Sequence, residues 1–249
     1  MEVPDLLSAH LRHPNGSGLN ISHGVPKPVG RGMCMQDQLI LIVGTGPQAQ
    51  IVADTLRALV YQGGQALLVG MIGEEAGQVG SWIAGAQVIG TLGEIGKFKH
   101  DAIICCVDGD IERKAIYEQL STQGERFVTV VHPAASVALE VEIGNGTYIG
   151  AHVVLSVACK VGANVVIRGP SSVGFHARIE DHVTIAPATV IGDDAKIGVA
   201  TSIEMGAKVL SRVKIGSFCR VSPNSVADID LPDLSVFGVP EGGDPAPHR

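Results

Sequence analysis

Aromatic residues are scarce in this sequence of 249 residues. Phe, Trp and Tyr together make up 4% of the chain, whereas glycine occurs 32 times. A core without large rings must be built from Val, Ile, Leu and Ala, and this favours a repetitive β architecture. The length allows one large domain or two small ones.

Runs of basic residues and long apolar stretches are also absent. The formal net charge is −7, and a protein that binds a nucleic-acid backbone needs clustered Lys and Arg, so we expect no nucleic-acid partner. No apolar stretch reaches the roughly 20 residues that span a bilayer. Residues 1–18 have neither the basic start nor the apolar centre of a signal peptide. We therefore expect a cytoplasmic protein without membrane insertion.

Cysteines with the spacing of a metal site are missing as well. The chain has five cysteines, an odd number, and the pair Cys105 and Cys106 lies in an apolar run. Buried free thiols are the better interpretation of this pattern. We expect no metal cofactor.

The chain divides into four parts. Residues 1–36 are rich in Pro, Gly, His and Ser without sustained periodicity, and we expect a mobile N-terminal extension. Residues 37–131 alternate apolar runs with helix-spaced stretches, which predicts a small Rossmann-like parallel α/β domain, its last strand at "RFVTVV". Residues 132–226 carry a six-residue repeat, and residues 227–249 form a C-terminal tail. The predicted fold class is therefore α/β plus β.

A glycine loop follows the first predicted strand. It consists of Gly44, Thr45, Gly46, Pro47 and Gln48. Its backbone amides and the next helix N-terminus would suit a phosphate, because ligands of such sheets bind at the carboxyl ends of the strands. The loop lacks the third glycine of a dinucleotide fingerprint, and no acidic residue clearly follows the second predicted strand. The same residues also suit a plain β–α turn.

The six-residue repeat begins at Val137. Fifteen consecutive positions at this spacing, from Val137 to Val221, are Val, Ile or Leu, and the residue four places after each is Val, Thr, Cys, Ser or Ala. Such hexapeptides are typical of a left-handed parallel β-helix, in which three hexapeptides make one coil. The left-handed connection is an exception to the usual right-handed rule.

Three histidines stand at fourth positions of hexapeptides, where we expect the side chains to lie on the outer surface. They are His152, His176 and His182. Residues eighteen apart stack on adjacent coils, so Asp194 is expected to lie next to His176. A carboxylate there would accept a hydrogen bond from the ring and support its positive charge, as a general base requires. A solvated polar ladder is the alternative interpretation.

These motifs together resemble a known family, over nearly everything after residue 36. "VGTGPQAQIVADTLRA", "DAIICCVDGDIERKAIYEQL", "VVHPAASV", the hexapeptides and "VSPNSVADIDLPDLSVFGVPEG" look like the NeuD/PglD-type acyltransferases, which acetylate sialic acid or nucleotide-linked amino sugars. The resemblance implies acetyl-CoA as cosubstrate, a homotrimer, and active sites between neighbouring subunits.

The resemblance also implies roles for individual residues. His176 would be the catalytic base, with Asp194 as its acidic partner. The loop from Gly44 to Gln48 would bind the nucleotide part of the substrate. His182 and the segment Gly238, Val239 and Pro240 would contact CoA. The chain departs from the family pattern where Phe175 occupies the usual position of the histidine, and where Ala177 rather than an acidic residue follows His176.

Three classes of function stay open on the sequence alone. The first is an acetyl-CoA-dependent sugar N- or O-acetyltransferase that uses no metal. The second is a sugar-nucleotide-binding homologue with impaired catalysis. The third is a β-helix zinc carbonic anhydrase, which needs three histidines that converge across a subunit interface.

Overall fold

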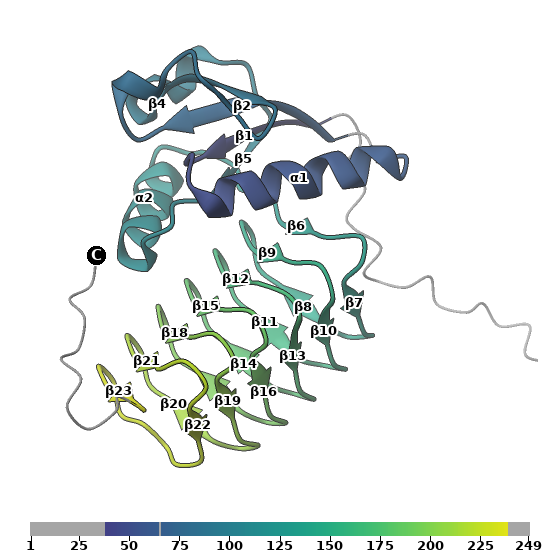
Figure 1. Cartoon of the computed structure of the whole chain (residues 1–249), viewed down its shortest axis with the longest axis vertical. Helices are drawn as coiled ribbons and strands as arrows, with labels where there is room; N and C mark the ends of the chain where they lie inside the picture. Colours follow the sequence, from purple (N-terminus) through teal and green to yellow (C-terminus); the bar gives the residue numbers. More distant parts are fainter. Residues whose placement is uncertain (1–37, 65, 239–249) are drawn as a thin grey trace, which may run out of the picture.

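The structure is a computed structural model that describes residues 38–64 and 66–238. The expected N-terminal extension, residues 1–36, lies outside the described residues, as do Val239 and Pro240. Within the described part, an α/β unit sits on a three-sided prism of short strands (Figure 1).

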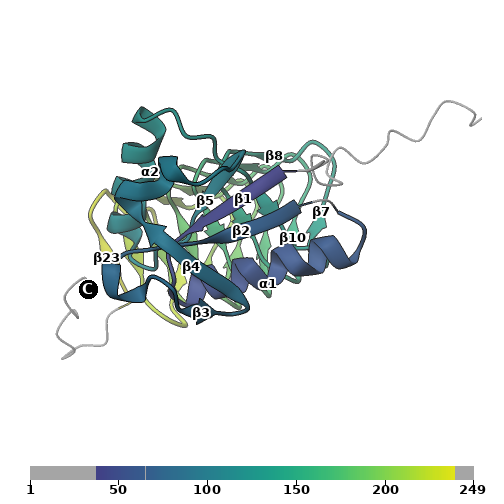
Figure 2. The same cartoon turned by 90° about the horizontal axis from the view of Figure 1, so that it is seen from above.

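The α/β unit contains a five-stranded sheet in the order β3-β4-β2-β1-β5. The strands β1 (Gln38–Val43), β2 (Ala66–Gly73), β4 (Ala86–Thr91) and β5 (Ala102–Cys105) are parallel, and β3 (Trp82–Ile83) is an antiparallel edge. Its helices are α1 (Pro47–Tyr61) and α2 (Asp110–Thr122), with two 3-10 turns, η1 (Ala76–Gln78) and η2 (Leu92–Lys97). β1 has a nearly continuous apolar sequence, as expected for a strand that lies between β2 and β5 and is covered by helices. Figure 2 shows α1 and α2 on opposite sides of this sheet.

The last strand expected for this unit is divided between the two parts of the molecule. Phe127 makes a single bridge to Ile103 beside β5, whereas β6 (Val130–Val131) pairs with a strand of the prism. The chain therefore crosses from one unit to the other within a few residues.

Three parallel sheets form the prism. The sheet that faces the α/β unit, here called the covered sheet, consists of β6, β9 (Tyr148–Ile149), β12 (Val166–Ile167), β15 (Thr184–Ile185), β18 (Ser202–Ile203), β21 (Arg220–Val221) and β23 (Val236–Phe237). The second sheet consists of β7 (Ser136–Val137), β10 (Val153–Leu155), β13 (Ser171–Val173), β16 (Val190–Ile191), β19 (Lys208–Val209) and β22 (Val226–Ala227). The third sheet consists of β8 (Glu142–Ile143), β11 (Lys160–Val161), β14 (Arg178–Ile179), β17 (Lys196–Ile197) and β20 (Lys214–Ile215).

The register of these sheets follows the hexapeptides. Val161 pairs with Ile179 and Ile179 with Ile197, so residues eighteen apart lie on adjacent coils. The aliphatic residues of successive coils point inward and are buried, Ile149, Ile167 and Ile185 among them. The architecture is consistent with the left-handed β-helix that the repeat predicts. Its strands begin two residues before residue 132, at β6, and β23 lies beyond residue 226.

Each coil turns at the fourth position of a hexapeptide. At these corners non-glycine residues adopt positive φ angles, for example 54° at His176 and 57° at Asp194. We name the corners by their residues. The far corner, between the second and third sheets, carries Ala158, His176 and Asp194; the helix corner, between the third and covered sheets, carries Asn164, His182 and Ala200; the cleft corner, between the covered and second sheets, carries His152, Pro170 and Ala188.

Helix α2 is fixed to the prism by a buried arginine. Arg113 donates hydrogen bonds to the His182 carbonyl (2.9 Å) and to Thr184 Oγ1 (3.0 and 3.1 Å). At the start of the helix, Asp110 accepts hydrogen bonds from Thr184 and from Ser202. These contacts connect α2 to the neighbouring strands β15 and β18, so the two units share one buried polar interface.

Candidate functional site

The far corner brings together the two residues that the sequence predicts to act as a pair. His176 Nδ1 lies 3.6 Å from Asp194 Oδ1, and the side chains are 63% and 57% exposed. The stacking of residues eighteen apart is confirmed. The distance is longer than a hydrogen bond, so the expected hydrogen bond from His176 to Asp194 is not formed in this structure. Phe175 projects into solvent beside them.

The glycine loop lies at the carboxyl end of β1, where the sequence places it. Gly44 has a φ of 118°, and a Cβ atom there would come within 2.6 Å of the Cys106 carbonyl oxygen, so only glycine fits. Pro47 occupies the first turn of α1, where a missing N–H costs nothing. The Gln48 N–H donates to Asp108 Oδ1 at 3.1 Å. A carboxylate of the chain itself therefore occupies this helix N-terminus.

Carboxylates gather at the same edge of the sheet. Glu74 follows β2 directly, so the expectation that no acidic residue clearly follows the second strand is wrong. Burial, followed by the nearby charges of Glu112, Asp108 and Glu75, raises the pKa of Glu74. β2 ends at Gly73, and the pair Glu74 and Glu75 follows it. This edge consequently suits the hydrogen-bond donors of a nucleoside better than its phosphates.

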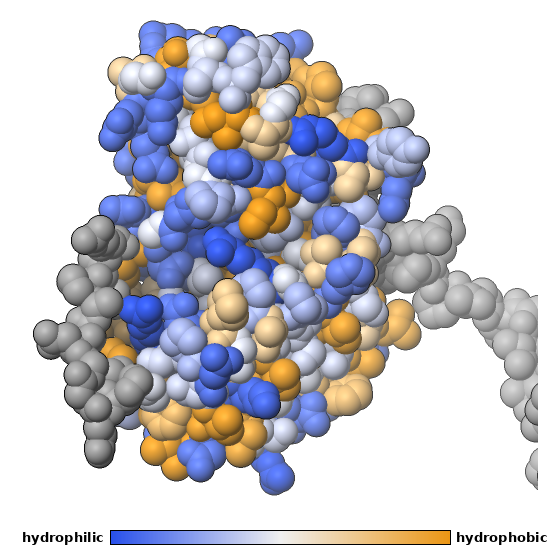
Figure 3. Space-filling model, in the orientation of Figure 1, coloured by the Kyte–Doolittle hydropathy of each residue, from blue (hydrophilic) through white to orange (hydrophobic). Residues whose placement is uncertain are grey.

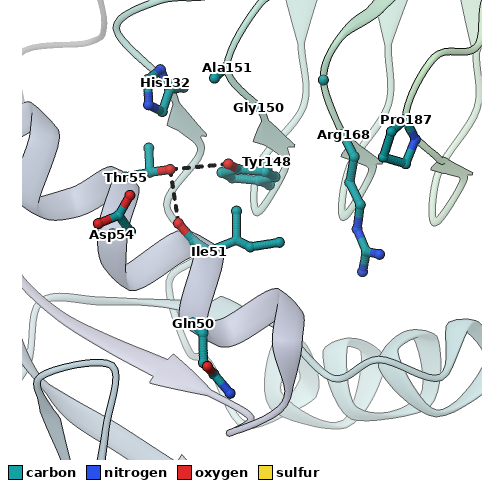
Figure 4. A pocket seen from close by; sticks show the side chains of 11 residues that line it. Gln50, Ile51, Asp54, Thr55, His132, Tyr148, Gly150, Ala151, Arg168 and Pro187 are labelled. Carbon is teal, nitrogen blue, oxygen red and sulfur yellow. Dashed lines mark hydrogen bonds between the residues drawn. The ribbon is translucent and has the colours of Figure 1, made fainter.

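A cleft of about 420 Å³ lies between α1 and the cleft corner (Figure 4). The residues that line it are Gln50, Ile51, Asp54, Thr55, His132, Tyr148, Gly150, Ala151, Arg168, Gly169 and Pro187. In the close-up, Arg168 and Pro187 stand on one side, His132 and Asp54 on the other, and Ile51 and Tyr148 between them. The Tyr148 hydroxyl is hydrogen-bonded to Thr55 Oγ1 at 3.1 Å, which fixes the ring in place. On the face drawn in Figure 3, hydrophilic residues gather along the junction of the two units.

The cleft is continuous with the glycine loop. Gln50 lines the cleft and its side-chain amide reaches the Thr45 carbonyl at 3.5 Å. Arg168 also lines it and donates from Nε to Gln48 Oε1 at 2.9 Å. A terminal nitrogen of Arg168 is 3.8 Å from Asp108 Oδ1. The loop and the cleft therefore form one polar surface on the same side of the prism.

Two titratable residues of the cleft have a clearly shifted pKa: burial raises that of Tyr148, and the pKa of His132 is lowered. Burial lowers that pKa, the charge of Asp54 opposes the effect, and His152 adds to the lowering. The neutral form of the ring therefore predominates at pH 7. Its Nδ1 accepts the Ala134 N–H at 3.0 Å, so the proton of the neutral ring is on Nε2.

Sequence reasoning missed the cleft. Asp54, His132 and Arg168 are far apart in the chain, and no motif connects them. One available signal was the position of "HP", residues 132–133, at the passage between the two units, where ligand sites are common.

The prediction that His182 lies on the surface is wrong. Its side chain is 7% exposed, because α2 covers the helix corner and Tyr117 packs edge-on against the ring. Asn164 Nδ2 lies 2.9 Å from His182 Nδ1. Burial, the largest effect, lowers the pKa of His182, although Asp181 opposes it. The expected contact of His182 with CoA stays a prediction. It concerns a residue that α2 of the α/β unit covers.

The expected CoA-binding segment falls partly outside the described residues. Gly238 has a φ of 83°, and a Cβ atom there would collide with Ser225 Oγ. It follows β23 at the last coil of the prism.

One chain does not bring all predicted site residues together. The loop from Gly44 to Gln48 adjoins the covered sheet and the cleft corner, whereas His176 and Asp194 occupy the far corner, on the opposite side of the prism. The histidines at positions 152, 176 and 182 stand at three different corners. Among residues 38–64 and 66–238, three or more His, Cys, Asp or Glu side chains nowhere gather in a way that could hold a metal ion.

Comparison with solved structures finds proteins of similar fold. A variant of perosamine N-acetyltransferase from Caulobacter crescentus, solved with CoA and GDP-perosamine, superimposes with a TM-score of 0.72 at 22% identity over 79% of this chain and 91% of that one. The acetyltransferase domain of PglB from Neisseria gonorrhoeae, solved with acetyl coenzyme A, gives 0.73 at 22% identity over 80% and 95%. WeeI from Acinetobacter baumannii gives 0.53 at 20% identity over 76% and 94%.

Sequence comparison reaches less far. The bifunctional protein GlmU of an Exiguobacterium strain is 28% identical over 123 residues, which are 47% of this chain and 26% of that protein. The match thus spans about a quarter of the length of this curated relative. No family model matches the chain. In the described part of the chain, every helix is too short or too polar to cross a membrane. The chain shares the fold of the sugar acetyltransferases, as its resemblance to the NeuD/PglD type predicts.

Proposed function

We propose that this chain is an acetyl-CoA-dependent acetyltransferase that modifies an amine or hydroxyl group of a nucleotide-linked amino sugar or sialic acid. The observation that carries the proposal is the pair of His176 and Asp194 on a fold shared with acetyltransferases. In this proposal the α/β unit is the Rossmann-like substrate domain, with the glycine loop beside the nucleotide.

The chemistry is a direct transfer. His176 Nε2 removes a proton from the attacking amine or hydroxyl group while that atom bonds to the thioester carbonyl carbon. The carbonyl oxygen becomes an oxyanion, which a backbone N–H of a neighbouring coil stabilises. The carbon–sulfur bond then breaks, and the CoA thiolate takes the proton from His176. Asp194 supports the transient imidazolium through Nδ1.

The active site requires two copies of the chain. His176 occupies the far corner and the loop with its cleft lies on the opposite side, so His176 of one subunit must act on the substrate held by another. The outer face of the second sheet offers a surface for association, because Val154, Val190 and Val226 are exposed there. We propose the homotrimer, in which closed symmetry repeats this contact three times.

Turnover measured as release of the CoA thiol tests the base. His176→Ala is expected to lower kcat by about 10²- to 10⁴-fold, the usual contribution of a positioned base. His152→Ala is the matched control, since it removes another exposed corner histidine at positive φ. Equal activity of both variants and the parent would remove His176 from the mechanism.

Mixing two inactive variants tests the shared site. His176→Ala keeps the cleft. Arg168→Ala keeps the base but removes the guanidinium that lies between the glycine loop and the cleft, so we expect it to lose substrate binding. In randomly mixed trimers about one quarter of the sites combine an intact cleft with an intact base from the neighbour, and activity should recover to that level. A mixture as inactive as its components would place the whole site in one chain.

A binder without catalysis is the second candidate. It is favoured by the exposure of His176 and Asp194, by their 3.6 Å separation, and by Phe175 in place of the family histidine. This candidate predicts that nucleotide sugars raise the melting temperature while acetyl-CoA does not, because a ligand stabilises only the protein that binds it. Release of CoA in the presence of an amino-sugar nucleotide would exclude it.

A further inference from the structure

We infer that the outer face of the third sheet docks an extended acidic segment of a partner protein, which lies along a row of stacked basic side chains. The row is here called the cation row, and it consists of Lys160, Arg178, Lys196 and Lys214. The inference goes beyond the proposed function, because none of these four residues takes part in the proposed transfer of the acetyl group.

The β-helix brings the cation row together from positions eighteen apart in the sequence. The register pairs each member with the next, Lys160 with Arg178, Arg178 with Lys196 and Lys196 with Lys214. Each member is exposed and precedes a buried aliphatic residue. Neighbouring strands lie about 4.8 Å apart, so the row places four positive charges along about 14 Å. A chain with a net charge of −7 therefore has a concentrated positive surface that no run of its sequence indicates.

The chain itself neutralises only one end of the row. Lys160 forms an ion pair with Glu142 at 2.8 Å, whereas the other three members form no ion pair with another described residue. The carboxylate of Asp181, on the same side of the prism, is used by the backbone, because it accepts the Ala163 N–H at 2.7 Å. Like charges at directly paired positions destabilise a sheet. The row is therefore unfavourable for the fold alone, and an anionic partner would relieve the repulsion.

The cation row stands on a flat strip. The residue two positions after each member is a glycine in three of the four strands and Glu180 in β14. A Cβ atom at Gly198 would come within 2.5 Å of the Gly216 carbonyl carbon, so the close stacking of coils keeps this strip free of side chains. In an extended polypeptide, alternate side chains point the same way about 6.6 Å apart, so three acidic residues at alternate positions match the length of the row.

Carboxylates on both sides of the row favour a narrow partner over a flat anionic surface. Glu180 and Asp181 stand toward the helix corner, and Asp193 and Asp194 stand toward the far corner; all four are exposed. An anionic bilayer would approach these carboxylates together with the cations, so repulsion would offset the attraction. A single extended chain meets the row alone.

The third sheet stays accessible in the proposed trimer. Contact between the far corner of one copy and the cleft corner of the next uses the two corners that border the second sheet. The second sheet then faces the symmetry axis. Helices α1 and α2 lie over the covered sheet (Figure 1), so the third sheet is the side of the prism that faces outward. A partner can therefore dock on it without separating the subunits.

Fluorescence anisotropy of a labelled peptide mixed with the full chain tests this surface. The probe is a peptide of about eight residues with glutamate at alternate positions, and the same peptide with glutamine should not bind. Arg178→Gln combined with Lys196→Gln should weaken binding about tenfold, because two exposed ion pairs with the peptide are lost. Lys99→Gln combined with Arg126→Gln is the matched control. It removes the same charges from exposed positions of the α/β unit and should change the affinity less than about twofold.

Three results of these measurements would overturn the inference. Equal weakening by the two double variants would show that net charge attracts the peptide, not the row. Competition between CoA and the peptide would assign the row to the acetyl donor. Row-dependent binding to vesicles of phosphatidylserine and phosphatidylcholine, without binding of the peptide, would assign it to a bilayer. Release of CoA from acetyl-CoA is measured separately and should be unchanged in Arg178→Gln combined with Lys196→Gln.

Melting temperatures without peptide test the premise that the row is unfavourable for the fold. Lys196→Gln removes a charge that lies between two like charges. Its melting temperature should therefore exceed that of the parent at low salt, and the difference should shrink as salt is added. A lower melting temperature of Lys196→Gln at low salt would show that contacts within the chain stabilise the row, and it would also overturn the inference.

Discussion

Removal of Arg113 should loosen the α/β unit from the prism. The side chain is 2% exposed and makes three hydrogen bonds to the His182 carbonyl and Thr184 Oγ1, and it lies 3.5 Å from Asp110 Oδ1. Burial, the largest effect, lowers the pKa of Arg113, and Asp110 opposes it. Deleting one partner of a buried ion pair costs about 3–5 kcal/mol. Asp110 keeps its bonds from Thr184 and Ser202, so we expect the lower end, about 3 kcal/mol, for Arg113→Ala.

The assay uses two probes of urea unfolding. The single tryptophan of the chain, Trp82, lies in β3 of the α/β unit, so its fluorescence reports that unit, while far-UV circular dichroism also reports the prism. The fluorescence transition of Arg113→Ala should move to lower urea and separate from the dichroism transition. A loss of about 3 kcal/mol corresponds to roughly 12–24 °C in melting temperature for a unit of the size of the α/β unit. Arg113→Lys keeps the charge but lacks the planar guanidinium, so its stability should lie between that of the parent and that of Arg113→Ala. Coincident transitions shifted by less than about 0.5 kcal/mol in Arg113→Ala would refute the reasoning.

Three further predictions concern pH, the corners and the glycine loop. Burial alone would lower the pKa of His100, but its hydrogen bonds to Glu125 and to the Phe98 carbonyl, with the charge of Glu125, raise that pKa above 6.5. The contribution of His100 to the free energy of unfolding is therefore complete below the unfolded pKa and is lost as pH rises through the folded pKa. Urea titrations between pH 5 and 8 should show this loss in the parent, and a His100→Gln variant with the same slope would contradict it. Ala158→Gly should raise stability by about 1 kcal/mol, because Ala158 has a φ of 57°, whereas Ala177→Gly, at a buried inward position, should lower it; a loss in both would show that the corner stores no strain. Gly44→Ala should cost about 1–3 kcal/mol, because the φ of 118° and the Cys106 carbonyl both exclude a Cβ atom, and an unchanged melting temperature would disprove this.

The sequence predicted those features that follow from a fixed period. The six-residue repeat defines the coils, and the step of eighteen residues brings Asp194 to His176. The loop after β1 was equally predictable, since glycine and proline mark the end of a strand and the start of a helix. These features depend on local chemistry, which a single sequence carries in full.

Features that depend on how the two units pack against each other could not be predicted from the sequence. The hexapeptide pattern is the same at all three corners, so it does not indicate that α2 buries His182 and leaves His176 exposed. The cleft arises because α1 rests on the covered sheet through contacts such as that of Thr55 with Tyr148, residues 93 positions apart. Such long-range packing has no signature in a short stretch of sequence.

The docking of the α/β unit also limits where chemistry can take place on the prism. The interior is filled by aliphatic side chains, and α1 and α2 cover the helix corner and the covered sheet at β9, β15 and β18. The far corner with His176 and Asp194 and the cleft corner are left open, and they lie on different sides of the prism. A substrate bound in the cleft can meet the His176–Asp194 pair only if another copy of the chain presents its far corner there. Self-association is therefore part of the proposed chemistry, and weakening it on the exposed face of the second sheet should abolish turnover while leaving the binding of nucleotide sugars intact.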